Sequence, residues 1–398
     1  MKKVSIVYNQ PLTQIQGINY VNNSFVIGGM YFREHGLFLS RIYAPDATFD
    51  CTTHNHLDII GSDVGTASYK RERRLRVFLR ELLSSEYLLG ACIKMYYNYT
   101  LNARKAVKRM IDDDSDYLIF QDLESARAFR KKYKNKDVKT ILILHTSDHP
   151  LEQIIPTFPG YYNNRWLRRR AYRRCDETIS MVDKVVYLSK HALEASTIAD
   201  NRKSYIFNGV EDIDNVKVLP PSNPLQLVSV GSVCVRKGQL VLVEALSLLD
   251  KEILRKLHLT IVGGGNDYDQ CVELVKEKEL QGVVTMTGPR NDVAEILKKM
   301  DVFILPSQSE GMPMSIIEAM RQGLYIMSTA TGGIPEMIEE CYGELITRDP
   351  HELAESIKQI VEKNVVTSDA KQQSRNRFEA DFTLKKMIER YSNVLLSL

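Results

Sequence analysis

Long hydrophobic runs are missing from this sequence. No stretch approaches the roughly 18 apolar residues of a membrane-spanning helix, so the sequence predicts no transmembrane helix. The chain starts with Met1-Lys2-Lys3 and a short apolar stretch that stops at Asn9-Gln10-Pro11. This stretch is too short for the hydrophobic core of a secretory signal peptide, and we interpret it as the first strand of the fold.

Closely spaced cysteines and a large net charge are missing too. None of the cysteines forms a C-x-x-C pair, and they lie far apart, at positions 51, 92, 175, 234, 271 and 341. This spacing favours reduced thiols in a cytoplasmic protein over a disulfide framework or a zinc ribbon. The net charge is only +3, and no nucleic-acid-binding motif is present, so we expect no nucleic-acid partner.

The composition is that of a globular protein, with 44% apolar and 26% charged residues. A chain of 398 residues can bury two independent cores. In the second half, apolar strand candidates alternate with helical stretches. The strand candidates are 225–231, 257–263, 283–288, 302–307, 324–329 and 343–347, and the helical stretches are 238–249, 267–279, 292–299, 314–322 and 335–340. This order predicts an α/β fold with a doubly wound parallel sheet.

The first half alternates less regularly but also contains apolar strand candidates. Its strand candidates are 4–8, 37–43, 117–121, 140–145, 185–188 and 204–207. A turn-rich stretch containing Pro220-Pro221-Ser222-Asn223-Pro224 separates the halves. We therefore expect an N-terminal domain at 1–211, a linker at 212–224 and a C-terminal domain at 225–383.

Glu310 and Glu318 lie in the most informative segment of the chain. An apolar strand precedes Glu310, the loop Gly311-Met312-Pro313 follows it, and a helix is expected from Met314. Parallel sheets bind ligands beyond the carboxyl ends of their strands, and a helix that starts there points free N–H groups at a phosphate. A carboxylate at Glu318 can accept two hydrogen bonds from a ribose diol. The alternative is an ordinary helix with two exposed glutamates.

This segment resembles the E-x7-E signature of retaining GT-B glycosyltransferases of family 4, the glycosyl transferases group 1. The match includes Gly311, Pro313, Glu318, Ala319, Met320 and Gly323. The resemblance implies a GT-B fold, in which two Rossmann-like domains face each other across a cleft. It also implies a last helix, 384–398, that packs back on the first domain.

The loop at 231–238 is similar to the family loop G-R-x-x-x-x-K-G, in which Arg and Lys hold the donor diphosphate. Lys237 and Gly238 match this loop, whereas Ser232 stands where the family has Arg, and Arg236 is the candidate substitute. The alternative is a solvated basic loop.

The resemblance implies a role for each remaining candidate. Lys237 and the helix at Met314 stabilise the diphosphate, while Glu310 and the N–H groups of Gly311 and Met312 orient the sugar. The other implied positions are His145 on the donor sugar, Arg290 at the nucleotide base and Gly17 in the first βα loop. A structural histidine is the alternative at position 145.

Two sequence patterns suggest a metal but do not complete a site. The run at 112–116 contains D-x-D, the metal clamp of the other glycosyltransferase fold, but it precedes a strand whereas that clamp follows one. The pairs His54 with His56 and His145 with His149 lack a further carboxylate or cysteine ligand. We therefore predict neither a metal nor any other cofactor.

Two basic stretches carry apolar and aromatic residues between their charges. One spans 65–110, and the other spans 165–174 and contains Trp166, the only tryptophan. An anionic membrane surface attracts such a pattern, and a solvated face is the alternative. The residues expected at the membrane or acceptor are Lys70, Arg73, Arg74, Arg168, Arg169 and Trp166.

The resemblance implies a retaining, metal-independent hexosyltransferase. We expect it to move a sugar from a nucleotide sugar, with UDP as the expected nucleotide, to a hydroxyl of a lipid-linked or saccharide acceptor. The expected setting is bacterial surface-polysaccharide or capsule synthesis at the inner face of the cell membrane. A nucleotide-sugar epimerase or phosphorylase and a non-catalytic GT-B binding partner remain as alternatives.

Overall fold

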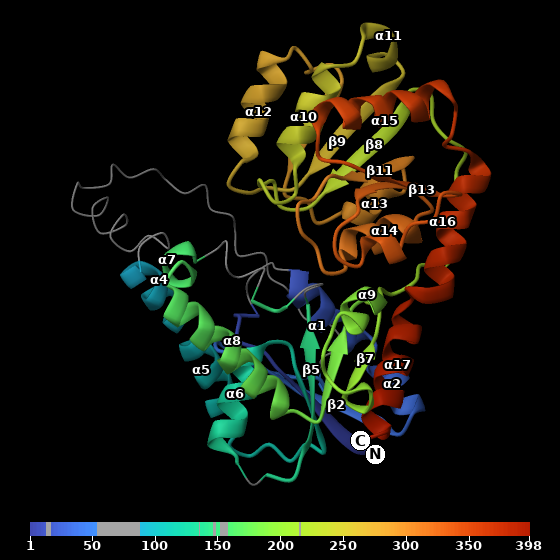
Figure 1. Cartoon of the computed structure of the whole chain (residues 1–398). Helices are drawn as coiled ribbons and strands as arrows, with labels where there is room; N and C mark the ends of the chain where they lie inside the picture. The colour runs from blue at the N-terminus through green and yellow to red at the C-terminus, as the bar shows by residue number, and fades with distance from the viewer. Residues whose placement is uncertain (13–16, 54–87, 135, 146–148, 152–157, 215) are drawn as a thin grey trace. The chain divides into compact units, whose positions relative to one another are not determined.

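The computed structural model describes the whole chain except residues 13–16, 54–87, 135, 146–148, 152–157 and 215. The chain forms two compact units (Figure 1). The first unit contains Met1–Ile206 and Lys385–Leu398, and the second contains Phe207–Leu384. The boundary therefore precedes the expected end of the first domain at 211, and the expected linker at 212–224 belongs to the second unit.

Within its described residues, the first unit has a sheet of seven strands in the order β3-β2-β1-β4-β5-β6-β7. The strands are β1 (Lys2–Val7), β2 (Leu37–Tyr43), β3 (Thr48–Asp50), β4 (Tyr117–Phe120), β5 (Lys139–Leu144), β6 (Lys184–Tyr187) and β7 (Lys203–Tyr205). All neighbours pair in parallel except β2 and β3. Because β1 and β4 are adjacent and the order runs outward from them, the switch point of this sheet lies between these two strands.

Helices flank this sheet (Figure 1). They are α1 (Gly17–Ile27), α2 (Gly29–Glu34), α4 (Leu88–Met95), a π-helical turn (Tyr96–Leu101), α5 (Asn102–Lys108), α6 (Leu123–Lys132), α7 (Pro159–Tyr162), α8 (Arg165–Ser180), α9 (Lys190–Glu194) and a 3-10 turn (Asp200–Arg202). The C-terminal helix α17 (Leu384–Leu396) lies beside α1 and α2, with the rings of Phe25 and Tyr391 4.9 Å apart.

The second unit has a fully parallel sheet of six described strands in the order β10-β9-β8-β11-β12-β13. The strands are β8 (Leu225–Val230), β9 (Leu257–Val262), β10 (Val284–Gly288), β11 (Val302–Leu305), β12 (Tyr325–Thr329) and β13 (Gly343–Ile346). Nearly every residue of β8, β9 and β11 is buried, as expected for a sheet covered on both faces.

The helices of the second unit follow the strands in alternation. They are α10 (Gln239–Ser247), α11 (Lys251–Leu254), α12 (Tyr268–Glu277), α13 (Val293–Leu297), α14 (Met314–Arg321), a 3-10 turn (Ile334–Glu336), α15 (Pro350–Glu362) and α16 (Ser368–Asp381). The chain passes between the units twice, and the two passages pair within the second unit through a parallel bridge of Val210 and Thr383. The doubly wound sheet places its switch point between β8 and β11.

Candidate functional site

The two loops with the strongest sequence patterns leave neighbouring strands of the second unit. The loop 231–238 follows β8 and the loop 306–313 follows β11, and these strands pair at Val302 and Leu227. The carboxyl ends of the strands on either side of a switch point form the usual ligand site of an open α/β sheet. The fold therefore brings together residues that are about 70 positions apart in the sequence.

Glu310 lies at the centre of this site and is only 8% exposed. Its Oε1 atom lies 2.7 Å from Lys237 Nζ and 3.0 Å from Arg236 Nη1, and it accepts a hydrogen bond of 2.9 Å from Ser307 Oγ. Arg236 Nη1 also donates to the carbonyl of Ser309 at 2.9 Å. Both cations thus pair with the same carboxylate oxygen. In the same positions, they could pair with another anion.

Two glycines allow the loops to approach this closely. Gly238 has φ +78°, and a Cβ there would lie 2.2 Å from the carbonyl oxygen of Pro306. Gly332 has φ +61°, and a Cβ there would lie 1.9 Å from the carbonyl oxygen of Glu310. Both positions therefore require glycine for steric and conformational reasons.

Gln239 shapes the loop that carries Lys237. Its Nε2 donates to the carbonyl of Ser232 at 3.2 Å, and its Oε1 accepts from the N–H of Cys234 at 3.4 Å. Ser232 itself is exposed, and its side chain makes no hydrogen bond to the cluster at Glu310 in the described part of the chain. Sequence reasoning missed Gln239, although a buried amide at the start of an apolar helix was a usable indication.

The amino end of α14 opens beside Glu310. Its N-cap is Pro313, which offers no side-chain acceptor. Ile316 N donates to the carbonyl of Pro313 at 3.2 Å, whereas the N–H groups of Met314 and Ser315 have no acceptor among the described residues. Two contacts fix the preceding loop. Gly311 accepts a hydrogen bond of 2.7 Å from the N–H of Gly333, and Met312 accepts one of 3.2 Å from Asn208 Nδ2. Among the described residues, the N–H groups of Gly311 and Met312 have no acceptor and remain available to a ligand.

Glu318 is half-buried on α14. Burial raises the pKa of this carboxyl group, and the positive charge of Arg321 opposes that shift. No hydrogen-bond donor among the described residues reaches its carboxylate. A desolvated carboxylate without donors is a suitable acceptor for the hydroxyl groups of a ligand.

Arg290, the candidate for the nucleotide base, is exposed after β10 and forms a bidentate ion pair with Asp292, with Nη2 and Oδ2 2.6 Å apart. It does not contact the cluster at Glu310.

The sequence of the second unit identifies the family. Residues 210–379 match the family model described as glycosyl transferases group 1. This match covers most of the second unit, so the second unit belongs to the glycosyl transferases group 1 family.

Individual relatives match over shorter stretches. AmsK of Erwinia amylovora, an amylovoran biosynthesis glycosyltransferase, is 33% identical over 124 residues, which are 29% of this chain and 30% of AmsK. The N,N'-diacetylbacillosaminyl-diphospho-undecaprenol alpha-1,3-N-acetylgalactosaminyltransferase of Campylobacter jejuni is 34% identical over 109 residues, or 27% of this chain and 28% of that enzyme. The chain thus matches less than a third of the length of these relatives.

The fold is shared over the whole chain. The crystal structure of HepE of Anabaena, solved in complex with UDP, superposes with a TM-score of 0.67 at 15% identity and covers 100% of both chains. The expected GT-B fold, with two Rossmann-like domains, is confirmed.

In the first unit, His145 follows β5 and is half-buried. Its Nε2 lies 2.7 Å from Gln121 Oε1. Burial lowers the pKa of His145 to about 4, so the ring is neutral at pH 7. Gly17, the other candidate in this unit, is the first residue of α1.

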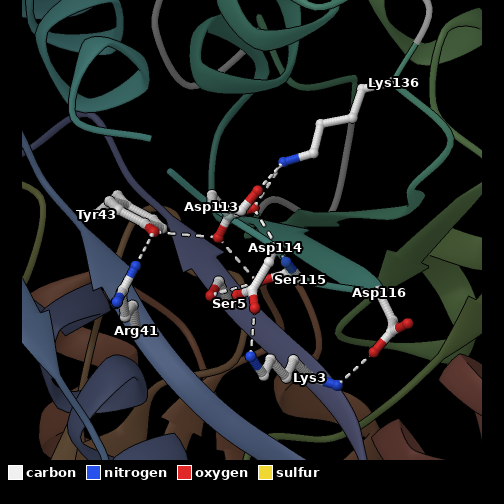
Figure 2. Close-up of polar contacts among 9 residues, drawn as sticks. All are labelled: Lys3, Ser5, Arg41, Tyr43, Asp113, Asp114, Ser115, Asp116 and Lys136. Atoms are coloured by element: carbon white, nitrogen blue, oxygen red, sulfur yellow. Dashed lines mark hydrogen bonds and ion pairs between the residues drawn. The ribbon is translucent and has the colours of Figure 1, made fainter. Parts of the chain in front are cut away.

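The acidic run before β4 forms ion pairs and hydrogen bonds within the first unit (Figure 2). Asp113 lies 3.1 Å from Lys136 Nζ and accepts hydrogen bonds from Tyr43 Oη at 3.1 Å and Ser115 Oγ at 2.9 Å. The Asp113 side chain is buried, and these three donors satisfy it.

Lys3 holds two further carboxylates of the run in Figure 2. Its ammonium pairs with Asp114, and its backbone N–H donates to Asp116 Oδ2 at 2.7 Å. The described residues contain no group of three or more His, Cys, Asp and Glu side chains that could hold a metal ion. The pair His54 and His56 lies outside them.

The membrane candidates fall in two places. Lys70, Arg73 and Arg74 lie outside the described residues. On α8, Trp166 is 65% exposed, and Arg168 and Arg169 are exposed too. No described helix is long and apolar enough to cross a bilayer.

Proposed function

We propose that this protein is a retaining glycosyltransferase that moves a sugar from a UDP-sugar donor to a hydroxyl acceptor. One observation carries the proposal: Arg236, Lys237 and the open amino end of α14 converge at the switch point of the second unit, with the desolvated carboxylate of Glu318 on the same helix. Cations and free N–H groups bind phosphate, while a carboxylate binds a ribose diol. The family and the UDP complex of HepE, which has the same fold, support this assignment.

Binding of the sugar donor would change the partners of Glu310. In the free protein the carboxylate of Glu310 neutralises Lys237 and Arg236. A bound diphosphate carries more charge than one carboxylate and would draw both cations to itself. Glu310 and the N–H groups of Gly311 and Met312 would then be free to bind the hydroxyl groups of the sugar.

Arg236 would replace the arginine that the family has at position 232. Its guanidinium shares Glu310 with Lys237, whereas the Ser232 side chain makes no hydrogen bond to the cluster in the described part of the chain. Two cations therefore remain for two phosphates, and this favours a working enzyme over a non-catalytic partner that kept only the fold.

Transfer would follow from stabilisation of the leaving group. The bond from the anomeric carbon to the β-phosphate oxygen breaks, and a bond from the same face to the acceptor oxygen forms. The acceptor proton passes to the departing phosphate oxygen. Lys237, Arg236 and the N–H groups of α14 would stabilise the charge that develops on UDP, which is electrostatic catalysis. These groups supply the positive charge that a metal supplies in D-x-D enzymes.

The acceptor would be a lipid-linked saccharide used in bacterial surface-polysaccharide synthesis. Two sequence relatives carry names of this kind, one for amylovoran and one for an undecaprenol-linked substrate. The exposed basic face of α8 with Trp166 would bring the enzyme to an anionic inner membrane face as a peripheral protein.

A donor panel tests the activity. The protein is incubated with UDP-, GDP- and ADP-sugars, with and without a chelator, and the released nucleotide is measured with a lipid-linked acceptor fraction and without it. We expect UDP release that requires the acceptor and survives chelation. A rate abolished by the chelator and restored by magnesium or manganese would contradict the assignment. Conversion of the donor without an acceptor would indicate an epimerase or phosphorylase.

A further inference from the structure

The first unit has a polar cluster at its own switch point. Tyr8 and Asn9 follow β1, and Gln121 follows β4, its neighbour in the sheet. Asn9 and Gln121 are each 2% exposed. The buried Nδ2 group of Asn9 has no acceptor among the described residues, so the cluster contains more donor capacity than the protein itself uses.

Here two hydrogen bonds link the side chains of His145, Gln121 and Asn22 into a chain. His145, after β5, lies with its Nε2 2.7 Å from Gln121 Oε1. Gln121 Nε2 donates to Asn22 Oδ1 of α1 at 2.9 Å. Asn22 is fully buried at 0% exposure, so the hydrogen-bonded chain ends inside the protein, away from bulk water. Because Gln121 donates its Nε2 to Asn22, its oxygen faces the ring, and a hydrogen bond between this oxygen and His145 requires a proton on Nε2 of the ring.

Asp122, the residue after Gln121, has its own hydrogen-bond donors. Asp122 caps α6 and accepts hydrogen bonds from Ser125 N at 2.8 Å, Ser125 Oγ at 2.7 Å and Asn9 N at 3.0 Å. The group behind His145 is therefore an amide and not a carboxylate. A carboxylate in that place stabilises an imidazolium ion, as in catalytic triads, whereas a neutral amide oxygen gives much less stabilisation.

We propose that Gln121, oriented by Asn22, is a positioning residue that keeps His145 neutral with its proton on Nε2 and so presents Nδ1 as a hydrogen-bond acceptor for a sugar hydroxyl. Among the described residues, Nδ1 of His145 has no partner. The ring would bind a hydroxyl group and would not transfer a proton. The sugar ligand rests on the proposed function, whereas the tautomer is a property of the free protein.

Burial is consistent with this assignment. It is the one cause of the lowered pKa of His145, and no charged neighbour among the described residues contributes to the shift. Both effects, loss of water around the ring and the absence of a carboxylate, disfavour the imidazolium form.

The first experiment measures the tautomer directly. Protein labelled with 15N-histidine is studied at pH 7 by long-range 1H–15N correlation, and the His145 signals are assigned by their loss in His145→Gln. We expect a neutral ring with a protonated Nε2 and an unprotonated Nδ1. An imidazolium pattern or a proton on Nδ1 overturns the proposal. This readout needs no donor and no activity, so it stands whether or not the proposed transfer reaction is found.

The second experiment places a carboxylate behind the ring. In Gln121→Glu the new carboxylate lies where the amide oxygen was, so His145 should gain a second ring proton. We expect kcat/KM for transfer to fall about tenfold at pH 7, because Nδ1 no longer accepts a hydrogen bond, and to recover at higher pH. UDP affinity should stay unchanged, because the residues proposed to bind UDP belong to the second unit.

Gln372→Glu is the matched control. Gln372 is exposed on α16 and pairs with Asn376, so this variant adds the same charge away from the hydrogen-bonded chain. The control should keep the pH profile of the native protein. The same pH profile and the same ring protonation in Gln121→Glu and the native protein would show that Gln121 has no positioning role.

Discussion

At the scale of single residues, three carboxylates of this chain are in three different states. Glu310 is buried and paired with two cations. Glu318 is desolvated and has no donor among the described residues, while Asp113 is fully satisfied by its own neighbours. The same chemical group therefore pairs with two cations at 310, lacks a donor among the described residues at 318 and accepts three donors within the fold at 113.

Glu310→Gln tests the exchange of partners between Glu310 and the diphosphate. The amide no longer neutralises Lys237 and Arg236, so the cations should bind UDP at least as tightly as in the native protein. Transfer should fall by roughly a hundredfold or more, because the sugar loses a charged partner. Calorimetry with UDP and a transfer assay measure the two effects. Parallel loss of UDP affinity and of transfer would show that Glu310 only supports the loop.

His145 predicts how stability depends on pH. Its pKa of about 4 in the folded protein lies below the ordinary value of 6.5, so the unfolded chain binds the proton first. The native protein should therefore lose about 2 kcal/mol of unfolding free energy from this group between pH 7 and pH 5. His145→Gln should not show this loss. Urea unfolding of both proteins at the two pH values measures it, and an equal loss in both would contradict the buried neutral ring.

At the scale of elements, the sequence predicted the strands well and the contacts between loops less well. The expected strand 37–43 coincides with β2, and all the expected strands of the second half are present. The repeating apolar pattern is local, so it can be recognised in the sequence. The expected helix at 335–340 is wrong, because the structure has a 3-10 turn at Ile334–Glu336. The turn begins at Ile334, Pro335 is its second residue, and it ends at Glu336.

The ion cluster could not be predicted from the sequence. Lys237 and Glu310 were expected to bind different parts of a donor, and the structure shows them bound to each other. Their contact depends on the pairing of β8 with β11, which no local pattern specifies. Asn208 was missed for the same reason, since its partner Met312 lies far along the chain. Gln239 has local partners, and its buried amide at the start of an apolar helix could have been recognised.

Gly332→Ala tests how the loops hold Glu310. A methyl group at φ +61° would lie 1.9 Å from the carbonyl oxygen of Glu310, so the Glu310 peptide must move. We expect a loss of stability of about 1–3 kcal/mol and at least a tenfold weaker affinity for UDP. Gly282→Ala is the control, because a Cβ there meets no atom within 4 Å. If both variants bind UDP like the native protein, the close approach at Gly332 does not shape the site.

At the scale of the whole molecule, two doubly wound sheets each place polar side chains at their switch point. In the second unit these are Lys237 and Glu310, and in the first unit they are Gln121 and Asn9. The first unit also carries the exposed basic face of α8. The proposed division of labour therefore assigns the nucleotide to the second unit and the acceptor and membrane to the first.

Liposome co-sedimentation tests the membrane role of α8. A variant with Trp166→Ala, Arg168→Ala and Arg169→Ala should lose most binding to anionic vesicles, because each basic residue contributes about 1 kcal/mol near such a surface. Binding of the native protein should weaken at high salt. A matched variant with Lys251→Ala and Lys276→Ala on the second unit should bind like the native protein. Equal binding to neutral and anionic vesicles would mean that the basic face is simply solvated.

The affinity of Glu318→Ala for UDP tests the central claim most directly. The native carboxylate has no protein donor among the described residues and should accept two charge-assisted hydrogen bonds from ribose. Their loss should cost on the order of 3 kcal/mol, so UDP should bind roughly a hundredfold more weakly by calorimetry. Glu252→Ala, at an exposed glutamate of α11, should bind UDP like the native protein. An unchanged affinity in Glu318→Ala would contradict the proposed nucleotide site.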